Sequence, residues 1–570
     1  MLLPVFHRSR GTLLVLFLGL VCATPVGAQA PALAKVLAGL DVTEASLQTL
    51  TMDLDTESGL FHTSVELGGV THTIELHRHS LRSDDFQVYA DVGGGELVAQ
   101  PDPPIVTWRG TVLEDPDAIV VASYLSDDLR AMVYTDQGTW GIQPVSDSGQ
   151  PGAANQYVVY SKNDLLIPEG FCGVSNDDAP EIPEGGAGPQ GTGQKIADIG
   201  LDADREYYLI NGSSLVATVN DMESILNFVS NVYEQPPISI TYEITTVVVR
   251  TVEPDPYSST SAGALLNQFD SAWSTSPENF IRRDVAHLFT GKNLSGNIIG
   301  VANIATVCIT SAAFALSQSR YTSNINLRIS LTAHELGHTW AGLHCNTQPP
   351  CHIMCTPNGG CQGVNPPIFG PSATTQIVAF KNTRSCLVNL ADPQPRPFIE
   401  EWTSTLLDTS KWTYNFNSSI NSGASGEPSP PNSLNMDRFD DSLPYQDDEI
   451  RTNFILMQGT TDPTLRYYTQ QGGVSAGEEL VVEYLTSLQH WSEINRITSD
   501  GSVQTTFQEH LHSLPPNARH NQFRVRFRAE VNSSGDDWYV DNISVTDGLP
   551  VNATLRIESI VGFPGATVDS

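Results

Sequence analysis

Basic residues are scarce in this sequence, in which 29 Lys and Arg stand against 64 Asp and Glu and leave a formal net charge of −35. Nucleic acids and anionic membranes bind proteins through clustered Lys and Arg, so neither is an expected partner. Long hydrophobic runs are also lacking, because the apolar run over residues 12–22 is shorter than the roughly 20 residues that a helix needs to span a bilayer. We therefore expect a soluble protein without a membrane span.

The first residues have the pattern of a secretory signal. Arg8 and Arg10 make a positive start, the apolar run follows, and the small residues VGA at 26–28 are of the kind found before a cleavage site. These features predict a signal peptide over residues 1–28 and a secreted, extracellular protein.

Cysteine is rare as well, with eight residues in the chain. Cys22 falls in the predicted signal peptide, and Cys172 stands alone upstream of the rest. In a secreted protein the others are expected to form disulfides, with metal ligation as the less favoured alternative. An odd thiol then remains at Cys172, either for a function or as an inert buried group. The six downstream cysteines are Cys308, Cys345, Cys351, Cys355, Cys361 and Cys386.

A chain of 570 residues is too long to fold around a single hydrophobic core, so its length predicts several domains. Residues 29–174 carry short strand patterns, such as Phe86–Val92 and Ala118–Tyr124, and predict a β-rich module. Residues 175–195 are polar and rich in Pro and Gly, which predicts an exposed linker open to proteolysis.

Strand and helix patterns alternate over residues 196–390 and predict an α/β domain. After a Pro-rich linker at 391–397, residues 398–548 have an all-β pattern, for which a β-sandwich is the natural class, and 549–570 form a tail. Within the α/β region the patterns predict helices around 225–232, 266–273 and 324–341, and strands at 207–210, 238–251 and 297–307.

The stretch HELGHTWAGLHC begins at His334. His334 and His338 lie on one face of a helix, so both imidazoles can bind one Zn²⁺, and Glu335 beside them can take a proton from water. His344 follows Gly342, which can end the helix and return the chain to the metal. Three histidines and one position for water make an open catalytic zinc site, whereas a closed structural site has a fourth protein ligand.

This motif, followed by Met354, resembles the metzincin zinc peptidases, in which a methionine turn lies beneath the metal. The resemblance covers about 195–390. Three further features are similar to the reprolysin, or ADAM-like, branch. The sequence CGV at 172–174 resembles its cysteine switch, and CLVN at 386–389 resembles the end of its catalytic domain. The segment that leads into its substrate-binding edge strand is similar to residues 284–291, 299–302 and Cys308.

The fold class implied by the resemblance is a β-rich prodomain at 29–174, an α/β metzincin catalytic domain at 196–390 with a mixed sheet and an active-site helix, and an all-β sandwich. One position departs from the family pattern, because Ala341 stands where the family has glycine, with Gly342 one place later. The helix is therefore expected to run one residue further before it turns.

The activity implied by the resemblance is that of a zinc endopeptidase, with Glu335 as general base, three histidine ligands and Met354 in the methionine turn. In the latent zymogen Cys172 would bind the zinc, until cleavage of the 175–195 linker removes the prodomain. Substrates are proteins or peptides, aligned by main-chain hydrogen bonds. The edge-strand residues that would align them are Gly300, Val301, Ala302 and Asn303.

The resemblance also implies that Cys308 pairs with Cys386, which leaves three possible pairings for the other four cysteines. It further implies a calcium site made by Asp284, the main-chain carbonyl of Cys386 and Asn389. A buried aspartate with a capping asparagine is the alternative to calcium. The C-terminal region resembles MAM-type or jelly-roll adhesion modules, which would bind glycans or surface proteins.

Two other functions stay open. One is an extracellular adhesion or glycan-binding protein whose peptidase domain is secondary or inactive, and the other is a zinc amidase that acts on cell-wall peptides. Glu335 favours an enzyme, because an inactive scaffold has no need of a base beside the metal.

Overall fold

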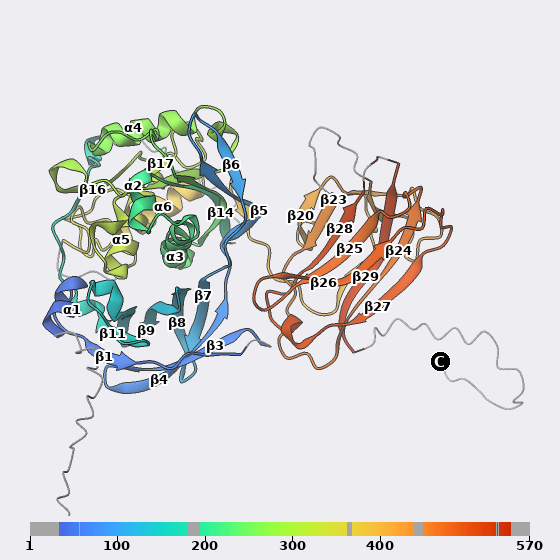
Figure 1. Ribbon diagram of the computed structural model, residues 1–570, viewed down its shortest axis with the longest axis horizontal. Coiled ribbons are helices and arrows are strands. Elements are labelled where there is room, and N and C mark those ends of the chain that lie inside the picture. Colours follow the sequence, from blue (N-terminus) through green and yellow to red (C-terminus); the bar gives the residue numbers. More distant parts are fainter. Residues whose placement is uncertain are drawn as a thin grey trace, which may run out of the picture.

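The structure is a computed structural model that describes residues 33–55, 58–178, 194–361, 367–437, 448–531, 533 and 535–548. Over this part the chain is mostly β, and its strands form four sheets (Figure 1). The predicted signal peptide at 1–28, most of the 175–195 linker and the tail at 549–570 lie outside the described residues. No helix in the described part is long and apolar enough to cross a membrane.

Most N-terminal strands form one antiparallel sheet, preceded by helix α1 (Leu33–Gly39). In spatial order its strands are β1 (Ser46–Thr49), β11 (Gln156–Ser161), β10 (Gly138–Pro144), β9 (Asp128–Thr135), β8 (Asp115–Leu125), β7 (Thr107–Val112), β4 (Val70–Arg78), β3 (Leu60–Leu67) and β2 (Asp53–Leu54). Gly68 and Gly69 link β3 to β4, and Ser126 and Asp127 link β8 to β9, all four with positive φ. Two-residue turns of this kind match the twist of paired strands, so local sequence sets these hairpins.

A second, mixed sheet combines strands from both sides of the 175–195 linker. In spatial order they are β12 (Phe171–Cys172), β16 (Ile298–Ala302), β17 (Phe314–Ser317), β15 (Val285–Phe289), β13 (Lys195–Ala203), β14 (Ile240–Arg250), β5 (Arg82–Asp91) and β6 (Leu97–Gln100), with β18 (Val388–Asn389) also paired to β13. The strands from β17 to β5 are parallel, and β17 and β15 are buried on both faces, as strands of parallel sheets are. The predicted boundary between prodomain and α/β domain is therefore not a boundary of this sheet.

Helices cover the second sheet. They are α2 (Arg205–Ile210), α3 (Leu215–Glu234), α4 (Ala262–Trp273), α5 (Ile325–Thr339) and α6 (Pro371–Lys381). Helix α3 lies between the two sheets, since it contacts β14 on one side and β7 and β8 on the other (Figure 1). The predicted strand at 207–210 was wrong: these residues lie in α2, whose start is capped by the Asp204 carboxylate, which accepts the N–H of Tyr207 at 2.8 Å.

The C-terminal region packs two antiparallel sheets around an apolar core of its own, in which Trp402 and Trp412 stack at 5.1 Å between ring centroids. The two sheets together make a sandwich that lies beside β5 (Figure 1). One sheet contains β21 (Ser419–Asn421), β22 (Ser433–Met436), β29 (Asp537–Asp547), β24 (Pro463–Gly472), β27 (Gln508–Ser513) and β19 (Phe398–Glu400). The other contains β20 (Trp412–Phe416), β23 (Asp448–Thr452), β28 (Val525–Glu530), β25 (Glu479–Leu485) and β26 (Trp491–Thr498).

Disulfides close the α/β region. Cys308 pairs with Cys386, across 78 residues, and the two local bridges are Cys345–Cys351 and Cys355–Cys361, each across six residues. This is one of the three local pairings that the sequence left open. Cys172 is the free cysteine of the described residues, and it is buried.

Loss of the long bridge should cost more stability than loss of a short one. Closing a 78-residue loop removes more entropy from the unfolded chain than closing a six-residue loop, by chain-entropy estimates of about 4 against about 2 kcal/mol. We expect a double serine replacement at Cys308 and Cys386 to lower the melting temperature more than one at Cys355 and Cys361. Calorimetry under non-reducing conditions measures both, and equal shifts would contradict the expectation.

Candidate metal centre

Helix α5 positions two histidines and Glu335 in the interior. The Asn324 side chain caps its start by accepting the N–H of Leu327, and every residue of the helix is buried. It packs against α3 on one side and β16 and β17 on the other. One helical turn separates His334 from His338, so both imidazoles leave the same face of the helix.

The chain turns back to the metal centre at Ala341 and not, as we expected, at Gly342. The helix ends at Thr339, and Ala341 adopts a left-handed φ of +69°. Two hydrogen bonds close this end, from Ala341 N–H to the His338 carbonyl and from Gly342 N–H to the Gly337 carbonyl, both at 2.8 Å. Glycine is needed at 342 for space, because a Cβ there would lie 2.8 Å from the Gly337 oxygen.

The turn brings His344 to the other two histidines. The Nε2 atoms lie 3.2 Å apart for His334 and His338, 3.1 Å for His334 and His344, and 3.2 Å for His338 and His344. Nitrogen ligands about 2.0–2.1 Å from a tetrahedral zinc ion are about 3.3 Å from one another, so this triangle fits zinc.

The proton positions on these rings require a cation. Nδ1 of His334 lies 2.6 Å from the Ile353 carbonyl oxygen, and Nδ1 of His338 lies 2.7 Å from that of Gly342. A carbonyl oxygen only accepts, so each Nδ1 carries a proton and each Nε2, in a neutral ring, carries none. Two bare nitrogens facing each other at 3.2 Å repel unless a positive ion lies between them.

Burial keeps the rings neutral, the form that binds metal. It lowers the pKa of His334 to about 3, with some contribution from His344, and the pKa of His344 to about 4. It also lowers the pKa of His338 well below its ordinary value.

Met354 lies directly beneath the helix end. Its side chain is fully buried, and its Sδ would be 2.8 Å from a Cβ placed on Gly337. Its backbone carbonyl accepts the N–H of Cys345, and the preceding residue, Ile353, holds the ring of His334. The segment at Ile353 and Met354, where the methionine turn was predicted, thus packs against the helix end that carries the histidines.

Glu335 faces the same space as the three histidines. It is fully buried, and its Oε1 has no hydrogen-bond partner within the described part of the chain, while Oε2 lies 3.4 Å from the Cys172 sulfur. Burial raises the pKa of this carboxyl well above its ordinary value. A buried carboxylate oxygen without a partner is costly, so its position points to a ligand or water that Oε1 receives there.

Gly300 in β16 allows this close approach of the carboxylate. A Cβ at that position would lie 2.3 Å from Oε1 of Glu335 and 2.6 Å from its carboxyl carbon. The remaining edge residues differ in their roles. Val301 and Ala302 pair with β17, whereas Asn303 lies beyond the strand, with its N–H bonded to the Phe314 carbonyl.

We expect Gly300→Ala to lower kcat/KM by about 100-fold, because a displacement of a catalytic group by about 1 Å has an effect of that size. Gly263→Ala is the matched control, since a Cβ there meets nothing within 4 Å. Peptide cleavage rates and bound zinc are measured for both variants. Wild-type kcat/KM in Gly300→Ala would contradict this role for Gly300.

Cys172 reaches the metal centre from the N-terminal side of the linker. Its sulfur lies 3.4 Å from Nε2 of His338, and its sulfur and the ligand nitrogens of the three histidines are all within 4.8 Å of one another. Strand β12 runs parallel to β16 and is held by a 2.8 Å hydrogen bond from Gly173 N–H to the Gly300 carbonyl. Burial, and then the Glu335 charge, raise the pKa of this thiol.

Asn176 is a contact that the sequence did not reveal. Its amide oxygen accepts the N–H of His344 at 3.0 Å, and its amide nitrogen donates to the His344 carbonyl at 2.8 Å. The N-terminal segment therefore holds a metal-site histidine by its backbone. An asparagine in a polar linker carries no local signal of such a role.

The region expected to bind calcium is built differently from the zinc region. Asp284 lies beside the Cys308–Cys386 bridge, and burial raises its pKa to about 6. The amide oxygen of Asn389 accepts a hydrogen bond from Lys195 at 2.7 Å, so an ammonium group already uses this oxygen. The calcium site stays a prediction.

A comparison with known families matches the part of the chain that carries this site. Residues 192–380 match the model Reprolysin_5, described as metallo-peptidase family M12. The matched residues include all of α5 and the chain through Met354. The match and the geometry together support a reprolysin-type, metal-dependent peptidase in this part of the chain.

Proposed function

We propose that this protein is a secreted zinc endopeptidase that is made as a latent zymogen. The observation that carries the proposal is the triangle of bare Nε2 atoms, 3.1–3.2 Å apart, with an unpartnered Glu335 oxygen beside it. Bound zinc would lower the pKa of a water ligand towards about 7 and polarise the scissile carbonyl.

Glu335 is the general base of the proposed reaction. Its Oε1 accepts a proton from the attacking water and returns it to the leaving amine, so one carboxylate serves both halves of the reaction. The apolar surroundings that raise its pKa also favour the protonated form that the second half needs.

An extended peptide is the substrate that suits β16. Its outer edge presents the Gly300 carbonyl, which accepts a backbone N–H from Gly173 at 2.8 Å. A substrate strand would take the place of β12 and use the same kind of hydrogen bond, which aligns a peptide of any sequence. The substrate class is therefore proteins and peptides.

Latency follows from the position of Cys172. Its sulfur lies 3.4 Å from Nε2 of His338, and a thiolate bound to the zinc would exclude water from the metal. Cleavage within the 175–195 linker would break the covalent connection between the chain that carries Cys172 and the peptidase domain. Signal-directed secretion provides the oxidising compartment that the three disulfides require.

Metal removal tests the proposed function. We expect linker-cleaved protein that has been separated from its propeptide to degrade a denatured protein library, to lose this activity after dialysis against a chelator, and to regain it with one equivalent of zinc. Mass spectrometry of the products and metal analysis measure this. Degradation that survives loss of the zinc would refute it. An intact protein library together with cleavage of purified cell-wall peptides would favour the amidase.

A further inference from the structure

The N-terminal segment does more than deliver Cys172, because its β5–β6 hairpin extends the sheet of the peptidase domain. Residues 87–91 of β5 pair in parallel with residues 246–250 of β14, and β6 pairs with the outer edge of β5 (Figure 1). Without this hairpin the part of β14 that pairs with it, residues 244 and 246–250, would be an open strand edge. Such an edge is a template for association with other chains, so it favours a bound partner strand.

The same segment shares an apolar core with the peptidase domain. Val88 from β5, Val121 from β8 and Met132 from β9 are fully buried in one cluster with side chains of α3 and α5. A core that is continuous across two segments keeps them together after the chain between them is cut, because separation would expose it to water.

Charged pairs also cross this contact in the interior. Arg250 of β14 lies 3.1 Å from the Asp91 carboxylate of β5, with both side chains less than a tenth exposed. Arg82 of β5 lies 2.7 Å from Glu223 of α3. Separating such pairs leaves charges that must be solvated again, which slows dissociation.

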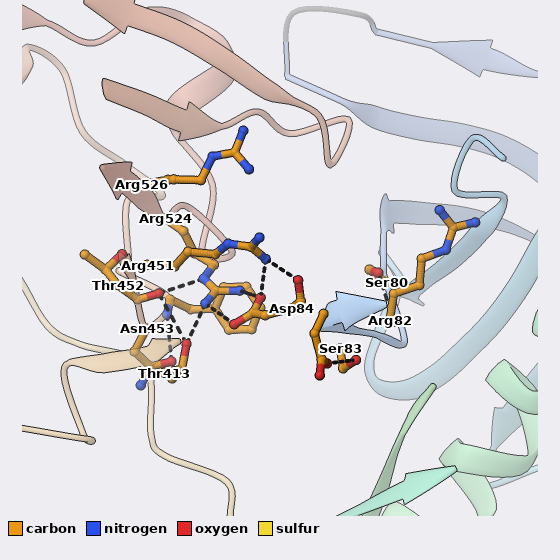
Figure 2. A network of polar contacts seen from close by, with 12 residues as sticks. Ser80, Arg82, Ser83, Asp84, Thr413, Arg451, Thr452, Asn453, Arg524 and Arg526 are labelled. Carbon is orange, nitrogen blue, oxygen red and sulfur yellow. Dashed lines mark hydrogen bonds and ion pairs between the residues drawn. The ribbon is translucent and has the colours of Figure 1, made fainter. Parts of the chain in front are cut away.

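The tip of β5 extends further, into the C-terminal sandwich (Figure 2). Arg524 binds the Asp84 carboxylate with two hydrogen bonds, of 2.7 and 2.9 Å. Arg451 adds a contact of 3.1 Å to the same carboxylate and one of 2.8 Å to the Asp84 carbonyl. A forked, two-bond contact of arginine with a carboxylate is both strong and specific in geometry.

Contacts within the sandwich also hold these two arginines, in addition to their contacts with Asp84. Arg524 donates to the Thr452 carbonyl at 2.6 Å and lies over the ring of Phe454, and Arg451 lies over the ring of Tyr414. Their side chains are 11% and 13% exposed, so solvent weakens the contact little. Burial opposes ionisation of Asp84, yet the two arginines lower its pKa to about 2, so it is charged at neutral pH.

We propose that the C-terminal sandwich is a second binding site for the propeptide, and that the propeptide stays bound to the peptidase after the linker is cut. Asp84 in the Arg451–Arg524 pair is the contact that sets its residence time. The proposal rests on the zymogen function above and deepens it. Linker cleavage is then necessary for activation but not sufficient.

The test measures release of the propeptide and not proteolysis. The full chain carries Glu335→Ala, a recognition site for an unrelated protease within 179–193, and tags at both ends. After the cut we expect the two fragments to elute together and the propeptide to dissociate slowly from the immobilised remainder. Asp84→Asn should speed dissociation by at least about tenfold, since it removes one charge of a shielded pair.

Asp85→Asn is the matched control. It removes a neighbouring carboxylate whose partner, Arg282, is half-exposed, so we expect less than about a threefold effect. Arg451→Gln alone should also speed release, and combined with Asp84→Asn it should add less than its separate effect, because both variants remove one contact. This double-mutant cycle distinguishes the effect of losing the contact between Asp84 and Arg451 from the effect of general misfolding.

Two outcomes would overturn the proposal. The propeptide could elute separately as soon as the linker is cut, or Asp84→Asn and Arg451→Gln could act independently of each other. Neither outcome bears on the zinc peptidase itself, which the metal-removal experiment tests separately.

Discussion

Glu335→Ala is expected to lower kcat by about 10³- to 10⁴-fold while zinc stays bound. General-base catalysis by a positioned carboxylate contributes about 10²- to 10⁴-fold, and this carboxylate serves both proton transfers of the proposed reaction. Zinc should remain, because the three histidines and their carbonyl partners do not depend on Glu335. The rate of peptide cleavage by linker-cleaved protein that has been separated from its propeptide, together with metal analysis, measures both quantities.

The comparison variant is His344→Ala, which should lose activity and zinc together. The carbonyl groups that bind the rings of His334 and His338 remain, but two nitrogen ligands hold zinc much less tightly than three. Equal cleavage by wild type and Glu335→Ala would contradict the assignment of the base and with it the proposed mechanism.

Cys172→Ser is expected to raise the activity of the uncut precursor by at least tenfold towards short peptides. Serine has nearly the volume of cysteine but is a far weaker zinc ligand, so the position beside His338 would open to water. Strand β12 would remain in place through main-chain hydrogen bonds, among them those of Gly173 N–H to the Gly300 carbonyl and Cys172 N–H to the Thr356 carbonyl, and a peptide can compete for such hydrogen bonds. A fluorogenic peptide assay on the intact chain measures this.

The control for the role of Cys172 is a chain that carries both Cys172→Ser and Glu335→Ala, and it should stay inactive. If intact Cys172→Ser were as inert as the intact wild type, the thiol would not be the source of latency. Steric cover by the β12 segment would then have to explain it, and release of the cleaved propeptide should activate both chains equally.

Much of the metal centre could be predicted because its spacing is local. His334, Glu335 and His338 sit within one helical turn, and helix geometry fixes which of them share a face. The helices α3 and α4 were likewise visible from apolar spacing. By contrast, Tyr207–Ile210 resembled a strand, because four apolar residues outweighed the capping aspartate three positions before them.

The turn at Ala341 marks the limit of such local rules. Sequence preference assigned the turn to glycine at 342, yet the structure places alanine in the left-handed conformation and uses glycine for a close backbone approach. Buried packing and two hydrogen bonds at the helix end offset the strain of that alanine. Only the assembled core supplies those contacts.

The sequence by itself therefore determined the proposed ligand set, the proposed base and the lone thiol, since each depends on residue type and short spacing. Tertiary structure alone decided that β5 and β6 join the peptidase sheet, that Gly300 admits Glu335, and that Asp84 reaches the sandwich. The physical reason is that strand edges pair through backbone groups that every residue carries. Such pairing leaves no mark on side-chain pattern, so it emerges only when distant segments are brought together.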